Sequence, residues 1–253
     1  MPPQEVPNPQ LPVVQRLRVR YAKRGRLRFT SHRDFARAFE RAIRRAGVPV
    51  AFSSGYSPHP RISYAGAAPT GSASEAEYLE IALTRTCDPD RVRTDLDAAL
   101  PEGLDVVGVV EVVCGSLADR LEASEWTLRL PDVDPTVAAA AVARFLAAET
   151  VEVERMTKRG LRRFDSRGAV VSLQCGTAPV SGEQKDDRVC AILNLVVRHG
   201  TPSVRPDDVL AGLREVAGLL TPSPPIQRRV SQGPLDLVTG TVGDPFAADR
   251  DTP

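Results

Sequence analysis

One short loop concentrates side chains that could bind or act on a polar ligand. Residues 55–61, Gly-Tyr-Ser-Pro-His-Pro-Arg, place an aromatic ring, an imidazole and a guanidinium close together in the sequence. The prolines on either side of His59 restrict its backbone, which would hold the imidazole ready for a ligand or a phosphate. Tyr56 could stack on a nucleic-acid base while Arg61 binds a phosphate. The alternative is a rigid loop in which His59 caps a backbone carbonyl.

Two of the three histidines could together supply an acid and a base. His32 lies in the first turn of an expected helix, and His59 lies in the loop just described. If the two rings converged they could cleave RNA without a metal, because one imidazole can accept a proton while the other donates one. The sequence does not show that they meet, and the alternative for His32 is a partly exposed, satisfied side chain. His199, followed by Gly200, is expected to lie in a turn.

Positive charge is concentrated near the N-terminus. Between Arg16 and Arg61 there are thirteen lysines and arginines but only Asp34 and Glu40, a net charge of +11 in a chain whose total is +1. Such a local field attracts a polyanion, so RNA is the first candidate partner and an acidic or phosphorylated protein surface is the second. The alternative is a set of solvated arginines without a partner. The candidate RNA-binding residues here, besides Tyr56, His59 and Arg61, are Arg18, Arg20, Lys23, Arg24, Arg37, Arg41 and Arg44.

A second basic cluster lies in the second half of the chain. Lys158, Arg159, Arg162 and Arg163 directly precede Phe164 in a segment that we expect to form a hairpin. The cluster could contact phosphates along a second edge, or it could simply keep the hairpin solvated. The first of these possibilities adds Lys158, Arg159 and Arg162 to the candidate RNA-binding residues.

Several classes of site have no signature in the sequence. The four cysteines, at positions 87, 114, 175 and 190, are far apart, whereas metal and iron–sulfur ligands on one loop are separated by about two to four residues. No P-loop, GxGxxG, HExxH or GxSxG pattern occurs. We therefore expect reduced, mostly buried thiols and neither a cofactor nor a metal.

The composition, 42% hydrophobic and 26% charged, is typical of a globular protein. No stretch approaches the roughly 20 apolar residues that span a bilayer. The N-terminus lacks the basic-then-apolar order of a secretory signal. We therefore expect a cytoplasmic protein with a disordered lead at residues 1–14 and a disordered, acidic tail at residues 236–253.

The element that carries most of the arginines is an expected helix. It begins at Ser31, with Asp34 three residues on as in a capping box, and it ends at Gly47. Apolar residues recur at helical spacing along it, so we expect one face to be buried and the other to be basic. The residues expected in the core are Phe35, Phe39 and Ile43.

The order of elements in the first half predicts a fold. Residues 16–22 alternate between polar and apolar side chains, as in a half-buried strand. The helix just described, two further strands, a helix beginning at Asp88-Pro89 and a last strand follow. Strand, helix, strand, strand, helix, strand is the order of a ferredoxin-like fold, an α+β fold with an antiparallel sheet. We assign it to residues 15–116.

Residues 120–235 are expected to repeat this order around an insertion. Helices begin at Asp134-Pro135 and at Arg205-Pro206. The insertion, residues 157–188, is expected to hold a hairpin around residues 170–173. The expected strands are residues 126–130, 151–156, 191–197 and 227–231. The sequence thus predicts two tandem ferredoxin-like units.

Four features of the first half match a known family. They are the basic first strand, the helix entry from Phe29 to His32, the loop from Gly55 to Ser63 and the stretch from Glu75 to Leu79. With these features the chain resembles the radical-SAM-linked domain family, whose function is not established. The resemblance covers roughly residues 16–115, and similar residues at 204–210 and 228–229 extend it to about residue 232.

In that family the domain occurs either behind a radical S-adenosylmethionine protein or as a separate chain. This chain resembles the stand-alone actinobacterial form, because it lacks the enzyme half and its cluster cysteines. The resemblance implies an accessory role beside a radical-SAM protein or RNA-processing machinery. It supplies no catalytic residues.

Three functions from different classes remain open. The leading hypothesis is a non-catalytic accessory protein that binds structured RNA, such as tRNA or rRNA, through a basic face. The second is a metal-independent endoribonuclease, since paired ferredoxin-like units with a basic groove resemble CRISPR repeat-processing nucleases. The third is a protein-interaction module whose basic face docks an acidic partner.

Overall fold

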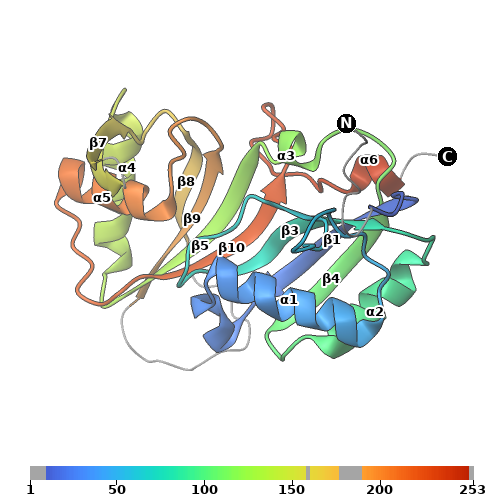
Figure 1. The fold of residues 1–253 in the computed structure, drawn as a ribbon. Coiled ribbons are helices and arrows are strands. Elements are labelled where there is room, and N and C mark those ends of the chain that lie inside the picture. The colour runs from blue at the N-terminus through green and yellow to red at the C-terminus, as the bar shows by residue number, and fades with distance from the viewer. Residues whose placement is uncertain (1–9, 158–159, 177–189, 251–253) are drawn as a thin grey trace. The chain divides into compact units, whose positions relative to one another are not determined.

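The computed structural model describes residues 10–157, 160–176 and 190–250 (Figure 1). These residues form a mixed α+β structure divided into two compact units. Unit 1 comprises the chain up to Arg120 together with the segment from Pro245 onward, and unit 2 comprises Leu121–Asp244. Unit 2 is therefore inserted into unit 1 in the sequence. No helix in the described part of the chain is long and apolar enough to cross a membrane.

Unit 1 is built on four strands in the order β4-β1-β3-β2, and each neighbouring pair is antiparallel. The two long helices α1 and α2 pack against each other and cover one face of these strands (Figure 1). The helices and strands of unit 1 are β1 (Gln15–Lys23), η1 (Gly25–Phe29), α1 (His32–Ala46), β2 (Ile62–Ala65), β3 (Ala73–Leu83), α2 (Pro89–Ala99), β4 (Leu104–Glu111), α3 (Leu117–Arg120) and α6 (Ala247–Arg250).

Local chemistry sets the two ends of α1 where the sequence predicts them. The Ser31 hydroxyl accepts the Asp34 amide at 3.2 Å, which satisfies one free donor of the first turn. Gly47 ends the helix in the left-handed conformation, with φ 64°, which costs glycine little. The predicted core of this helix is confirmed, because these side chains are at most 3% exposed: Phe35, Phe39 and Ile43.

Unit 2 contains a second set of four antiparallel strands, in the order β10-β5-β9-β8. Its helices α4 and α5 begin after Asp134 and Arg205, as predicted. Helix α4 packs on α5, β8 and β9. The helices and strands of unit 2 are β5 (Ala123–Pro131), α4 (Pro135–Ala147), β6 (Glu152–Thr157), β7 (Gly160–Asp165), β8 (Val170–Gly176), β9 (Cys190–Arg198), α5 (Pro206–Ala217) and β10 (Ile226–Gly233).

The prediction for the insertion in unit 2 is wrong in one respect. The hairpin lies at β6 and β7, which pair only with each other, and β8 takes the place in the sheet predicted for residues 151–156. Gly160, at φ 108°, adopts a conformation that other residues rarely reach and allows the chain to reverse directly after β6. Both segments have strand periodicity, so the sequence pattern could not distinguish between them.

The prediction of a disordered tail at 236–253 is also wrong for the residues that the structure describes. The chain forms a bridge between Leu235 and Val242, and then returns to unit 1, where α6 forms and Phe246 is fully buried. Residues 1–9 of the predicted lead lie outside the described residues. The expectation of buried thiols is wrong as well, because Cys114 is exposed and the other three cysteines are half-buried.

Candidate nucleic-acid interface

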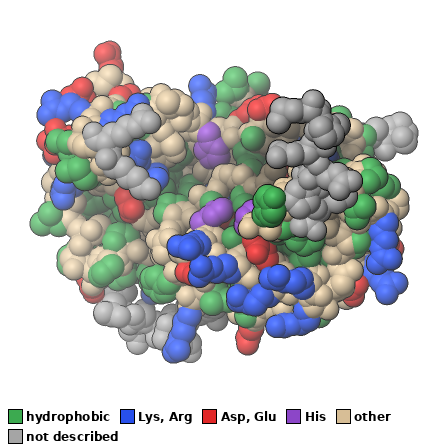
Figure 2. Space-filling view, viewed as in Figure 1, with side chains coloured by type: hydrophobic (Ala, Val, Ile, Leu, Met, Phe, Trp, Pro, Cys, Tyr) green, Lys and Arg blue, Asp and Glu red, His purple; other side chains and the backbone are tan. Residues whose placement is uncertain are grey.

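The outer face of α1 presents the largest exposed set of basic side chains in the +11 stretch. The apolar side of this helix faces the sheet, so residues three and four positions apart on its other side share the solvent-facing surface. Figure 2 shows Lys and Arg side chains gathered over the position of α1. The exposed arginines of this face are Arg33, Arg37, Arg41, Arg44 and Arg45.

Acidic side chains do not neutralise this arginine face. Arg33, Arg37, Arg41 and Arg44 make no ion pair or side-chain hydrogen bond among the described residues. Arg45 donates to the carbonyl of Ala99 at 3.1 Å, which leaves its charge uncompensated. Like charges spaced four residues apart on a helix repel each other by about 0.2–0.5 kcal/mol per pair. The arginine face is therefore slightly unfavourable by itself.

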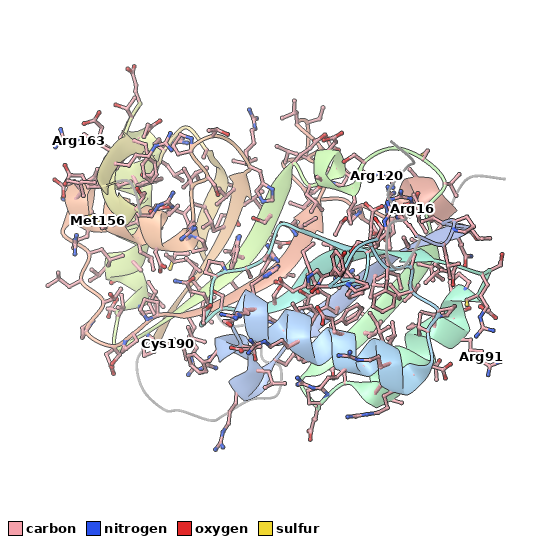
Figure 3. All side chains as sticks on the ribbon, viewed as in Figure 1. Arg16, Arg91, Arg120, Met156, Arg163 and Cys190 are labelled. Carbon is pink, nitrogen blue, oxygen red and sulfur yellow. The ribbon has the colours of Figure 1, made fainter. Side chains whose placement is uncertain are left out.

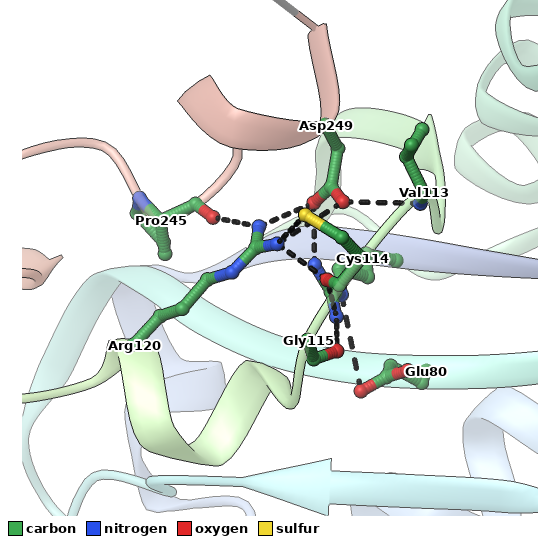
Figure 4. Close-up of polar contacts among 8 residues, drawn as sticks. Glu80, Val113, Cys114, Gly115, Arg120, Pro245 and Asp249 are labelled. Carbon is green, nitrogen blue, oxygen red and sulfur yellow. Dashed lines mark hydrogen bonds and ion pairs between the residues drawn. The ribbon is translucent and has the colours of Figure 1, made fainter. Parts of the chain in front are cut away.

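Arg18, a predicted RNA-binding residue on β1, is not available to a partner. Its side chain is fully buried, and its Nη1 donates to Asp249 Oδ2 at 2.5 Å (Figure 4). Its Nη2 donates to the carbonyls of Cys114 and Gly115, at 3.2 and 2.6 Å. The alternation of side chains along β1 places Arg18 on the face of the sheet away from α1 and α2. The C-terminal segment that contains Asp249 covers this face at Arg18. Arg18 is therefore a structural cation of unit 1.

Three more predicted residues of the first stretch are engaged within unit 1. Arg20 donates to the carbonyl of Glu75 at 2.8 Å, and Lys23 is only 5% exposed. Arg24 bridges the carboxylates of Glu75 and Asp105. Arg24 donates hydrogen bonds to the Glu75 carboxylate, and these outweigh the opposing effect of burial and raise the pKa of Arg24 above its usual range. These cations stabilise the fold, so they add little to the free positive surface.

The 3₁₀ helix η1 adds an exposed aromatic residue that sequence reasoning missed. Phe29 is 59% exposed, and the guanidinium of Arg28 lies 4.7 Å from the centre of its ring. Exposed large aromatic rings are unusual on a protein surface, because their burial is favourable. A flat ring beside a cation could stack on a base while the cation meets a phosphate. The signal was present in the sequence as an aromatic residue inside the most basic stretch.

The predicted ligand loop forms a small hairpin-like excursion. Phe52 forms a β-bridge with Pro60. The Ser53 amide donates to the carbonyl of His59 at 2.9 Å, and the His59 amide donates to the hydroxyl of Ser53 at 3.0 Å. At the tip, Tyr56 is 92% exposed. Arg61 is half-buried, and its backbone pairs with Ala51. The loop thus presents Tyr56 and His59 to solvent, but the ring of His59 caps no carbonyl among the described residues.

The two candidate acid–base histidines are not joined by any contact in the described chain. His32 packs edge-on against the ring of Tyr64 on β2, with 4.7 Å between ring centres. The buried hydroxyl of Tyr64 has no hydrogen-bond partner among the described residues, and burial, helped by Glu40, raises its pKa. His32 therefore belongs to an aromatic cluster, and no hydrogen bond links it to His59.

The second basic cluster is only partly described. Lys158 and Arg159 lie outside the described residues, and Arg162 is exposed on β7. Arg163, labelled in Figure 3, pairs with Glu154 at 2.7 Å and with Glu152 at 3.6 Å. Only Arg162 of the described cluster therefore remains as a free cation, and it lies in unit 2.

Both ring nitrogens of His199, in unit 2, make hydrogen bonds. Its Nδ1 donates to the carbonyl of Leu121 at 2.7 Å, so its Nε2 accepts the hydroxyl of Ser124 at 3.1 Å. The same hydroxyl oxygen accepts Trp126 Nε1 at 2.8 Å. Burial, reinforced by Arg229, lowers the pKa of His199. This buried network holds the start of β5, and the sequence carried no signal for it.

Within residues 10–157, 160–176 and 190–250, no three His, Cys, Asp or Glu side chains converge as metal ligands. What the arginine face can do is attract and hold a polyanion.

Comparison with known proteins adds a family. A family model described as "Uncharacterized protein conserved in bacteria (DUF2344)" matches residues 16–206. The match includes the arginine face, the loop at residues 53–61 and most of unit 2, and it ends before the C-terminal segment that returns to unit 1. No curated protein matches the chain.

Proposed function

This chain belongs to the DUF2344 family of bacterial proteins, and we propose that it is a non-catalytic accessory protein that binds structured RNA. The observation that carries the proposal is the arginine face of α1, where exposed guanidinium groups make no ion pair among the described residues. A bound polyanion would offset the repulsion between these groups and release its own counterions. Arg37, Arg41 and Arg44 form the centre of this interface.

The exposed aromatic rings favour RNA over an acidic protein. Phe29 and Tyr56 are 59% and 92% exposed, and Arg28 lies against the Phe29 ring. Single-stranded loops of structured RNA offer bases that stack on such rings, with about 1–3 kcal/mol per base. Arg61 and Arg162 could add phosphate contacts, whereas Arg18, Arg20, Lys23 and Arg24 are engaged inside unit 1.

We also propose that both units are ferredoxin-like. In each, the strand that closes the unit lies beside the first strand, as in β4-β1-β3-β2 and β10-β5-β9-β8. The resemblance noted in the sequence supports a partner that is either a radical-SAM protein or RNA-processing machinery. Structured RNA of the tRNA or rRNA kind would place the protein in the cytoplasm.

The test is a charge reversal with a matched control. Replacing Arg37, Arg41 and Arg44 by Glu should abolish binding of fluorescently labelled tRNA or rRNA fragments, measured by anisotropy. Replacing Arg85, Arg91 and Arg93 by Glu makes the same change in net charge outside the arginine face and should leave binding close to that of the wild type. Circular dichroism checks that both variants fold. Equal losses in both variants would mean that net charge, and not this face, determines binding.

The ribonuclease alternative needs a separate readout. Purified protein incubated with total RNA in EDTA should produce no discrete fragments, since His32 and His59 form no acid–base pair among the described contacts. Discrete fragments that disappear with His59→Ala would replace the adaptor hypothesis by the nuclease. If RNA is not bound even at low salt, the module that docks an acidic partner becomes the better hypothesis.

A further inference from the structure

Helix α5 of unit 2 and the proline-containing segment that follows it enclose a pocket of about 590 Å³. This volume is within the range of ligand-binding clefts. One wall is apolar and includes Leu220, which is 69% exposed, so an apolar group that covered this wall would gain free energy. The prolines restrict the backbone of that wall, which keeps the pocket formed before a ligand binds. The residues that line the pocket are Asp207, Leu210, Ala211, Arg214, Leu219, Leu220, Thr221, Pro222 and Pro225.

A second pocket, of about 440 Å³, lies between α5 and the hairpin of β6 and β7. Ala211 and Arg214 line both pockets, so the two adjoin along the helix and form one groove. Because alanine is small, a larger side chain at position 211 would enter both pockets. The residues that line the second pocket are Glu152, Val153, Glu154, Arg163, Ala211, Arg214 and Glu215.

The second pocket is rich in carboxylates. Glu154 and Glu152 share the guanidinium of Arg163, at 2.7 and 3.6 Å. Glu215 makes no ion pair within the part of the chain that the structure describes. Four carboxylates and two guanidinium groups line the groove as a whole, which gives it a net charge of −2. The groove therefore favours a ligand that carries a positive charge beside an apolar group.

The spacing of the two pockets fits an extended peptide. Leu210 of the first pocket and Glu215 of the second are five residues apart on α5, about 7 Å along the helix axis. Two residues of an extended chain span about 6.6 Å, and their side chains i and i+2 lie on the same side. Arg214, which lines both pockets, can donate to a backbone carbonyl of such a chain.

We propose that this groove binds an extended segment of a partner protein that carries an apolar residue and, two positions later, lysine or arginine. The apolar side chain enters the pocket between α5 and residues 219–225. The basic side chain lies among the carboxylates of Glu152, Glu154 and Glu215. All lining residues belong to unit 2, so the inference does not depend on RNA binding by the arginine face.

A set of synthetic peptides tests this specificity. The probes are fluorescent peptides Gly-Ser-Xaa-Ser-Zaa-Ser-Gly, in which Xaa and Zaa are varied over all amino acids, and anisotropy measures their binding to the full-length chain. Affinity should be highest with leucine, isoleucine or methionine at Xaa and with lysine or arginine at Zaa. Changing lysine to glutamate at Zaa should weaken binding about fivefold or more, because attraction to the carboxylates becomes repulsion.

Variants of the chain show whether the peptide with leucine and lysine binds in the groove. Ala211→Leu fills the junction of the two pockets and should abolish binding, whereas Ala140→Leu, on the exposed side of α4, should leave it unchanged. Glu215→Lys should weaken binding about fivefold, and its matched control Glu149→Lys should not. The charge reversal on α1 should leave peptide binding unchanged, which separates this site from the RNA interface.

Circular dichroism checks that each variant folds. If Ala211→Leu does not fold, the comparison of Glu215→Lys with Glu149→Lys decides the result. Equal affinity for all peptides, no binding of any peptide, or equal effects of these two charge reversals would overturn the proposal.

Discussion

Arg18 of β1 and the arginines of α1 come from one basic stretch of sequence, yet their surroundings are opposite. Arg18 of β1 is fully buried and surrounded by a carboxylate and two carbonyls. Arg37 of α1 is exposed and has no ion pair within the described chain. Other elements of the chain can pack on both faces of a strand inside a sheet, whereas the outer face of a surface helix stays in solvent. The net charge of a segment is therefore not the charge available to a partner.

The same difference separates stability from binding. A buried guanidinium must be compensated, so its partners are required for the fold. Exposed arginines are well hydrated and screened, and they contribute little to folding. Substitution of Arg18 on β1 should change the free energy of unfolding. Substitution of the exposed arginines on α1 should change only the affinity for the partner.

The largest expected effect tests the buried side of this comparison. Arg18→Ala should destabilise the protein by about 3–5 kcal/mol, because it leaves the Asp249 carboxylate buried beside fewer donors. Arg37→Ala should change stability by no more than about 0.5 kcal/mol. Urea unfolding followed by circular dichroism measures both. A similar, small change for the two variants would show that Arg18 is not a structural cation.

Local sequence signals predicted the parts of the fold that depend on local physics. The Ser31 cap, the Gly47 stop and the prolines after Asp88, Asp134 and Arg205 placed the ends of helices correctly, because each acts on backbone groups within one turn. The buried side of α1 followed from spacing alone.

Contacts between distant residues could not be predicted in this way. Arg18 and Asp249 are far apart in the sequence, and nothing local marks residues 245–250 as the cover of a strand. The choice of β8 over β6 for the sheet also depends on tertiary packing. Among the candidate site residues, the helix arginines and Tyr56 are exposed as expected, whereas those on β1 are enclosed by parts of the chain that the local pattern does not reveal.

The next largest effect tests the exposed side. If the arginine face and its neighbours neutralise about six phosphates, RNA affinity should fall about 10³-fold or more between roughly 50 and 200 mM salt. Anisotropy titrations at several salt concentrations give the slope of log affinity against log salt. Replacing Arg37, Arg41 and Arg44 by Gln should reduce that slope by about 2. An unchanged slope would mean that the phosphates are bound elsewhere.

A smaller effect is the pH dependence of the stability that the buried Asp249 carboxylate provides through its ion pairs with Arg18 and Arg120. Burial tends to raise the pKa of Asp249, but hydrogen bonds from Arg120, the Val113 amide and Arg18 outweigh it and lower the pKa overall. The stabilisation by this carboxylate is therefore complete above its unfolded pKa of about 3.9 and is lost as the pH falls through the lower folded value. The stability difference between wild type and Asp249→Asn should thus shrink below about pH 4.

The control for this pH series is the exposed Asp119, in α3. Asp119→Asn should leave stability close to that of the wild type throughout the same range, as measured by urea unfolding at each pH. A constant difference between wild type and Asp249→Asn down to low pH would contradict the assignment of Asp249 as a charged partner of the two arginines.

The smallest expected effect concerns the two exposed aromatic rings of unit 1, Phe29 and Tyr56. Phe29→Ala and Tyr56→Ala should each weaken RNA binding by about 1 kcal/mol, roughly fivefold, because each removes a surface on which one base can stack. Tyr56→Phe keeps the ring and should bind like the wild type, which separates stacking from loss of the hydroxyl. Neither alanine variant should change the salt slope, since no cation is removed. A reduced slope in these variants, or full affinity without the rings, would leave phosphate contacts as the whole of the interface.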